Sequence, residues 1–209
     1  MLKPTNMPEL KQERARVTRN KILAATREIL QETGIEKVST NLIAKQAGVN
    51  IASLYKYFPN KYEILKVLAF EFSARQTSLI CEYLNNVPLE TPLKNVCHGL
   101  VDALINGTRN DRALVQLQRA LIVMPELHEA YRLSNIDIAD AMKPFLKQWG
   151  IRMTKPQLEV AMTCLGEACG ALQDLALSRD ANYDEAVIDE LKLLLTAYYE
   201  ARMTPSAKS

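Results

Sequence analysis

The side chains best suited to bind another molecule are polar and lie close together between residues 39 and 61. They supply hydroxyl, amide and ammonium groups, which can bind phosphate oxygens or pair with the edges of nucleic-acid bases. The set comprises Thr40, Asn41, Ser53, Tyr55, Lys56, Tyr57 and Lys61. Such a set is unusual for a protein core and well suited to contact with DNA, so this segment predicts a nucleic-acid-binding surface.

Two short helices joined by a tight turn would bring these side chains together. Apolar residues between positions 42 and 47 predict the first helix, and residues 51–58 predict the second. Gly48 can adopt the positive φ that a sharp turn requires. Asn50 can cap the second helix by accepting a hydrogen bond from its free N–H groups. The pattern predicts a helix-turn-helix whose second helix enters a major groove.

Residues 22–65 resemble the DNA-binding domain of the TetR family of bacterial transcriptional regulators. The resemblance covers about a fifth of the chain and depends on many matches in register. The matching residues are Ile22-Leu23-Ala24-Ala25, Gly34, Ser39-Thr40, Ile43-Ala44, Ala47-Gly48-Val49, Leu54-Tyr55, Tyr57-Phe58, Lys61 and Leu65. The resemblance implies a homodimeric cytoplasmic regulator that binds a palindromic operator in double-stranded DNA.

The resemblance also implies roles for the polar side chains of the helix-turn-helix. Asn41 would reach a base, where an asparagine can pair bidentately with adenine. The residues expected to contact the phosphate backbone are Thr40, Ser53, Lys56, Tyr57 and Lys61. Two interpretations stay open for Tyr55, whose ring could pack on a sugar or thymine methyl or could brace its helix against the core.

Ile51 and Ala52 depart from the polar residue followed by glycine that is commoner in the family. They offer only apolar surface, which suggests contacts with thymine methyl groups.

The distribution of charge along the chain agrees with a DNA-binding N-terminal part. Residues 1–61 carry a balance of +6 and the remainder a balance of −4, within a net charge of +2. The alternative is chance clustering of charges on solvated helix faces.

The composition favours an all-α fold of about nine helices, because glycine is scarce and β-branched runs are absent. We expect a mobile basic arm over residues 1–13 and a three-helix DNA-binding domain over 14–60. Its first helix would start near residue 16. A helical effector-binding and dimerisation domain would cover residues 61–203, followed by a disordered tail over 204–209.

The family implies a ligand pocket and a dimer interface in the second domain. Pocket candidates are Leu104, Leu121, Met124, Tyr131, Met142, Phe145 and Trp149, which suit an apolar or aromatic molecule. Polar groups that could orient such a molecule are His98, Asp102, Arg119 and His128. Dimer candidates are Leu158, Met162, Leu165, Cys169, Leu172, Leu191, Leu194 and Tyr198, near Gly166 and Gly170, which permit close helix approach. The pocket candidates could equally fill the core.

The sequence predicts neither an enzyme nor a cofactor or metal site. It lacks the GxSxG, HExxH, GxxxxGK[ST] and GxGxxG motifs, and its four cysteines include no CxxC pair. Apolar runs are too short for a membrane span or signal peptide, so we expect a cytoplasmic protein.

The expected function is that of a repressor that its effector releases from DNA. Two alternatives are an activator or ligand-independent regulator, and a helical interaction module that does not bind DNA.

Overall fold

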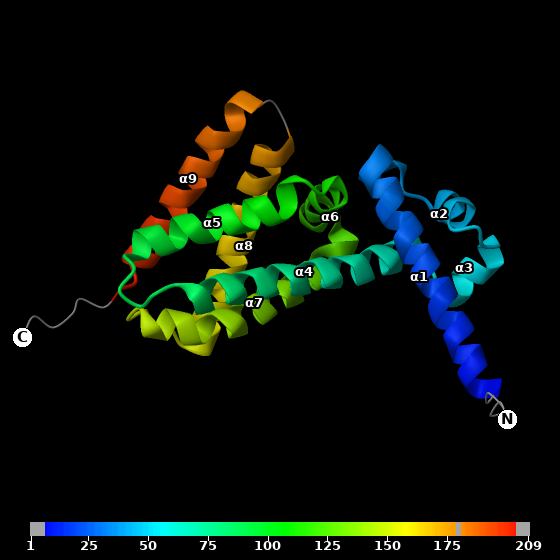
Figure 1. Cartoon of the computed structure of the whole chain (residues 1–209), viewed down its shortest axis with the longest axis horizontal. Helices are drawn as coiled ribbons and strands as arrows, with labels where there is room; N and C mark the ends of the chain where they lie inside the picture. The colour runs from blue at the N-terminus through cyan, green and yellow to red at the C-terminus, as the bar shows by residue number, and fades with distance from the viewer. Residues whose placement is uncertain (1–6, 179–180, 204–209) are drawn as a thin grey trace, which may run out of the picture. The chain divides into compact units, whose positions relative to one another are not determined.

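The computed structural model describes residues 7–178 and 181–203, and this part of the chain is helical apart from short connections (Figure 1). Its helices are α1 (Met7–Thr33), α2 (Thr40–Gln46), α3 (Ile51–Tyr57), α4 (Lys61–Asn86), α5 (Leu93–Arg109), α6 (Arg112–Val123), α7 (His128–Gln148), α8 (Lys155–Ser178) and α9 (Ala181–Glu200). Two 3-10 turns, η1 (Ile35–Lys37) and η2 (Pro125–Leu127), precede α2 and α7. The prediction of an all-α fold with about nine helices is confirmed.

The first helix begins earlier than the sequence analysis predicted. α1 starts at Met7 rather than near residue 16, so residues 7–13 are helical and do not form an arm. Pro8 lies in the first turn, where its missing N–H would have no helical partner, and the residues that follow are mostly strong helix formers. The rest of the predicted arm and the predicted tail over 204–209 lie outside the described residues.

The chain divides after Leu68 into two compact units, and α4 continues from the first unit into the second. The predicted boundary lay eight residues earlier, at the start of α4. The first turns of this helix belong to the first unit, and Ile64, Leu65 and Leu68 within them are buried. The boundary between the two units therefore lies within α4 rather than at its start.

Local contacts in the first unit build the predicted helix-turn-helix. The Ser39 hydroxyl caps α2 by accepting a hydrogen bond from the Leu42 N–H at 3.3 Å. Asn50 caps α3 in the same manner, with its Oδ1 2.8 Å from the Ala52 nitrogen. Gly48 has a φ of 63°, as the turn between the helices requires. Buried Leu54 anchors the short α3 in the core of this unit.

Replacing Gly48 with alanine tests this turn. No atom lies within 4 Å of the position that a Cβ would take, so only the backbone conformation is strained. We expect the free energy of unfolding of the first unit to fall by about 1 kcal/mol, as measured by urea denaturation. Gly150 has a φ of 75° and equally open surroundings, so Gly150→Ala is the control in the second unit. An unchanged Gly48→Ala protein would contradict the role assigned to this turn.

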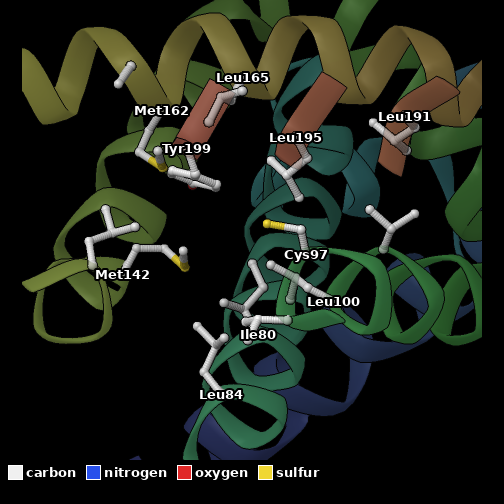
Figure 2. Close-up of a cluster of buried hydrophobic side chains, with 14 of the residues drawn as sticks. Ile80, Leu84, Cys97, Leu100, Met142, Met162, Leu165, Leu191, Leu195 and Tyr199 are labelled. Atoms are coloured by element: carbon white, nitrogen blue, oxygen red, sulfur yellow. The ribbon is translucent and has the colours of Figure 1, made fainter. Parts of the chain in front are cut away.

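The second unit is organised around α8, which packs against α6, α7 and α9, while α9 also packs against α5. Side chains from several of these helices meet in one hydrophobic cluster (Figure 2). The members labelled in Figure 2 are Ile80, Leu84, Cys97, Leu100, Met142, Met162, Leu165, Leu191, Leu195 and Tyr199. Among the described residues, no helix combines the length and the apolar character needed to cross a membrane.

Candidate DNA-binding surface and effector cavity

The predicted DNA contacts lie on the surface of the helix-turn-helix. The exposed members are Asn41, Ala52, Tyr55 and Lys56, and the half-buried members are Thr40, Ile51, Ser53, Tyr57 and Lys61. α2 and α3 pack on each other and on α1, which holds both helices in place. The structure thus places the predicted set on α2, on α3 and, for Lys61, at the start of α4, and contact with DNA itself remains a prediction.

A hydrogen bond links the two helices of this motif on their outer side. The hydroxyl groups of Thr40 and Tyr55 lie 3.0 Å apart, and either can donate. Tyr55 is 50% exposed, so its ring is not enclosed by the core. Tyr55 still braces the motif, through its hydroxyl, and its ring face stays available to a sugar or a thymine methyl.

Lys61 is partly engaged within its own chain. Its ammonium donates to the Val38 carbonyl at 3.2 Å and lies 5.4 Å from the centre of the Tyr62 ring. An ammonium group has three N–H donors, so this hydrogen bond leaves two for a phosphate. The internal contact fixes where the charge lies, which would reduce the entropy lost on binding DNA.

Every charged side chain in residues 37–62, which include the helix-turn-helix, is positive. No acidic residue occurs between Glu36 and Glu63, whereas four lysines do. These are Lys37, Lys45, Lys56 and Lys61. The sequence analysis omitted Lys37 and Lys45, both of which are exposed. A concentration of positive charge without carboxylates attracts the phosphate backbone regardless of base sequence.

The second unit contains a cavity of about 120 Å³ to which α4 through α9 all contribute. Figure 2 shows part of its wall, including Met142, Met162 and Tyr199. Of the predicted pocket residues, four line this cavity: Leu104, Leu121, Tyr131 and Met142. The other three, Met124, Phe145 and Trp149, are not in its lining.

Their placement explains why these three residues were predicted incorrectly. The rings of Phe145 and Trp149 stack with centroids 6.5 Å apart, and both pack against the core of the unit. Met124 ends α6 and leads into the turn before α7. Hydrophobic spacing alone could not separate a side chain that fills the core from one that borders a cavity.

Polar side chains in the cavity wall were missed by the sequence analysis. Gln118, Asn135 and Gln173 all lie in the wall and are buried. The Gln118 Nε2 donates to Gln173 Oε1 at 2.7 Å and to the Gly170 carbonyl at 3.3 Å. None of the predicted orienting residues, His98, Asp102, Arg119 and His128, belongs to this wall. Asp102 instead forms an ion pair with Lys192 at 2.7 Å.

The cavity wall is uncharged. Among the residues that the structure describes, its lining includes no lysine, arginine, histidine, aspartate or glutamate. Burial raises the pKa of Tyr131 and of Tyr199 well above the usual range of a phenol, and raises that of the Cys169 thiol to about 12. All three groups are therefore protonated at neutral pH, and the cavity presents neutral surface only.

The predicted dimer residues lie mainly on the inner side of α8 and α9. Leu158, Met162, Leu165 and Leu191 are buried in the core of their own chain, so the prediction is wrong for these four. Cys169, Leu172 and Tyr198 are half-buried, and Leu194 is 37% exposed. The exposed apolar side chains of these helices include Val160, Cys164, Ala171, Leu175, Ala186, Leu193, Leu194 and Ala197.

Gly166 and Gly170 also serve the interior of the chain. A Cβ on Gly166 would lie 2.5 Å from the Asn135 Oδ1, and one on Gly170 would lie 2.9 Å from the Tyr131 hydroxyl. The close approach that these glycines permit is therefore between α8 and the side chains of α7. Both glycines also line the cavity and so help to shape its wall.

Two family models match the chain and together cover both units. A model described as bacterial regulatory proteins, tetR family, matches residues 22–68. A second model, the tetracyclin repressor-like C-terminal domain, matches residues 92–198. The first contains the helix-turn-helix, and the second contains most of the residues around the cavity.

Individual relatives are distant. The nucleoid occlusion factor SlmA of Haemophilus influenzae is 26% identical over 111 residues, which are 53% of this chain and 50% of that protein. This chain therefore spans about half the length of the curated relatives that it matches first.

Solved structures of similar fold cover most of the chain. FadR of Thermus thermophilus, solved with lauroyl-CoA, has a TM-score of 0.64 and 20% identity over 91% of this chain and 100% of that one. RolR, solved with resorcinol, has a TM-score of 0.63 and 19% identity over 95% and 98% of the two chains.

Proposed function

Because this chain belongs to the TetR family of bacterial regulatory proteins, we propose that it is a transcriptional repressor that leaves its operator when a small molecule occupies its cavity. One observation carries the proposal. The same chain combines an exposed helix-turn-helix, rich in lysine and free of carboxylates, with a buried cavity whose wall holds unpaired polar atoms. The first feature suits DNA, and the second suits a small effector.

On DNA, α3 would lie in the major groove with its N-terminal residues nearest the bases. Exposed Asn41 would read adenine through its amide, and Ala52 would meet a thymine methyl. The lysines and hydroxyl groups around them would bind phosphates and set the register of the protein on the duplex. In this arrangement the sequence preference depends on few side chains, and most of the affinity comes from the backbone contacts.

Two copies are needed to read a palindromic operator, since each motif reads one half-site. We propose that the second copy covers the exposed apolar side chains of α8 and α9. Val160 is 64% exposed and Leu193 is 60% exposed, and burying such side chains against a partner would stabilise a dimer. Homodimers are usual in this family, which supports the assignment.

Replacing Leu193 with glutamate is expected to convert the dimer to a monomer at micromolar concentration. An unpaired carboxylate in each half of a two-fold interface is costly to desolvate, so we expect the dissociation constant to rise about 100-fold or more. Sedimentation velocity measures the change. Val123, which is 57% exposed on α6, provides the control Val123→Glu. If both variants remain dimeric, the interface lies elsewhere.

The effector would act by shifting a population between two conformations. A ligand weakens operator binding only if it binds the DNA-incompetent conformation more tightly. FadR was solved with lauroyl-CoA and RolR with resorcinol, so small-molecule binding by proteins of this fold supports an effector for this chain. A regulator without an effector is the second candidate, but it leaves the unpaired polar atoms of the cavity unexplained.

Selection of binding sites from random DNA duplexes tests the proposed function. The purified protein should enrich an inverted repeat whose half-sites are centred about one helical turn apart. Asn41→Ala should relax the preference at one position in each half-site, at a cost of about 1–3 kcal/mol. Absence of any enriched sequence would overturn the assignment as a sequence-specific regulator.

A further inference from the structure

The cavity contains two buried polar atoms that form no hydrogen bond, Gln118 Oε1 and Asn135 Nδ2. One is an acceptor and the other is a donor. We infer that the effector is a small uncharged molecule that donates a hydrogen bond to Gln118 and accepts one from Asn135. The inference rests on the proposed function only in identifying this cavity as the effector site.

The orientation of the Gln118 amide is set by its neighbours. Its nitrogen donates to Gln173 Oε1 and to the Gly170 carbonyl, two acceptors on α8. Turning the amide over would place its oxygen against the Gly170 carbonyl, which is unfavourable. Gln118 Oε1 is therefore left without a donor on a side chain that is 6% exposed, and such a buried acceptor costs about 1–3 kcal/mol until a donor arrives.

Asn135 presents the complementary group. Its side chain is 3% exposed on α7, and the missing Cβ of Gly166 makes room for it against α8. Hydrogen bonding of the amide to the Tyr131 hydroxyl opposes the rise in the pKa of that phenol that burial causes, but Nδ2 carries two N–H groups and lacks a well-aligned partner. A ligand acceptor in the cavity would supply its missing partner.

The lining excludes an ionised ligand. No charged residue lines the cavity, and its ionisable groups, Tyr131, Cys169 and Tyr199, are protonated at neutral pH. A carboxylate or ammonium would lose its hydration without gaining a counter-charge, which is far more costly than burying a neutral amide or hydroxyl. The same argument favours a ligand whose remaining surface is apolar.

Size limits the ligand further. The volume of about 120 Å³ is comparable with the engineered apolar cavity of about 150 Å³ in another protein that holds benzene. The cavity is somewhat smaller than one that holds benzene, so a single ring with one polar substituent requires flexible side chains of the wall, such as Met142 and Met162, to move. Benzamide meets each requirement, because its N–H can donate to Gln118 and its carbonyl can accept from Asn135.

Isothermal titration calorimetry of the full-length protein with benzamide, benzoate and toluene tests the inference. The three probes share a ring, but only benzamide is neutral and carries both a donor and an acceptor. We expect benzamide to bind about ten-fold or more tightly than either of the others. Equal or tighter binding of benzoate or toluene, or no binding of benzamide, would overturn the inference.

Variants then test the two side chains. Gln118→Met keeps the volume but removes the acceptor, so benzamide affinity should fall about ten-fold while toluene affinity should not fall. Gln116→Met is the matched control, on the same helix but outside the cavity wall. Asn135→Leu, which removes the donor, provides a second variant should Gln118→Met fold poorly. Unchanged benzamide affinity in a folded variant of either residue contradicts its role.

Measuring operator binding on the same samples distinguishes a wrong ligand class from a wrong proposed function. If the wild-type protein binds its selected DNA site but not benzamide, the ligand class is wrong and the regulator remains. If the protein enriches no DNA site yet binds benzamide through Gln118, the proposed function fails and the cavity chemistry stands.

Discussion

Replacing Ala52 with glutamate should abolish operator binding at concentrations where the wild-type protein is saturated. Ala52 is exposed in the first turn of the short α3, the part of a recognition helix that lies nearest the bases. A carboxylate about 5 Å from a phosphate costs about 3 kcal/mol at an effective dielectric constant of 20, so the dissociation constant should rise more than about 100-fold. Fluorescence anisotropy with a labelled operator duplex measures this loss.

The design separates loss of binding from loss of folding. A glutamate in the first turn of a helix interacts favourably with the helix dipole, so α3 should remain intact. Ala74→Glu introduces the same charge at an exposed position of α4 in the second unit and serves as the control. If Ala52→Glu binds the operator as tightly as Ala74→Glu, α3 is not the recognition helix.

Replacing Leu54 with alanine should unfold the first unit at a much lower temperature than the second. Leu54 is fully buried, and removing a buried leucine side chain costs about 2.7–5 kcal/mol. In a unit of this small size, a loss of about 3 kcal/mol lowers the unfolding temperature by more than about 10 °C. Differential scanning calorimetry should show an early transition absent from the wild-type trace.

Two comparisons make this second prediction specific. Leu54→Met nearly conserves the volume, so its unfolding free energy should change by less than about 1.5 kcal/mol. Benzamide, if it binds the cavity, should raise the later transition of Leu54→Ala and leave the early one in place. A single transition at the wild-type temperature would show that Leu54 does not anchor α3.

The helix-turn-helix could be predicted because its determinants are local. Ser39, Gly48 and Asn50 each act within a few residues of their own position, as an N-cap, a turn and a second N-cap. Interactions of this kind can be recognised from residue type and spacing. The start of α1 was missed because Pro8 was interpreted as a break in structure, although proline is compatible with the first turn of a helix.

The cavity depended on contacts that sequence spacing does not show. Gln118 and Asn135 lie on the apolar faces of α6 and α7, among Leu117, Leu121, Ile138 and Met142. An amide on an otherwise apolar helix face was the signal that could have identified them. Which core side chains border the empty space depends on how six helices pack, so only part of the predicted pocket was correct.

Several residues predicted for the dimer interface are buried in their own chain because α8 is apolar on more than one side. Val160 and Leu175 point outward, while Leu158 and Leu165 are buried. Periodicity identifies an apolar face only when the opposite face is polar. For such a helix, only the packing of α6, α7 and α9 around it decides which residues are available to a second subunit.

Because the cavity lining is neutral, operator binding and effector binding should respond differently to ionic strength. Contacts with phosphates release counterions, so operator affinity should fall steeply as salt increases. A neutral ligand in a cavity without charged residues neither releases nor takes up ions, so its affinity should stay nearly constant. When a cell raises its internal salt under osmotic stress, a given effector concentration would therefore free a larger fraction of operators. The threshold for induction would move although the effector site itself had not changed.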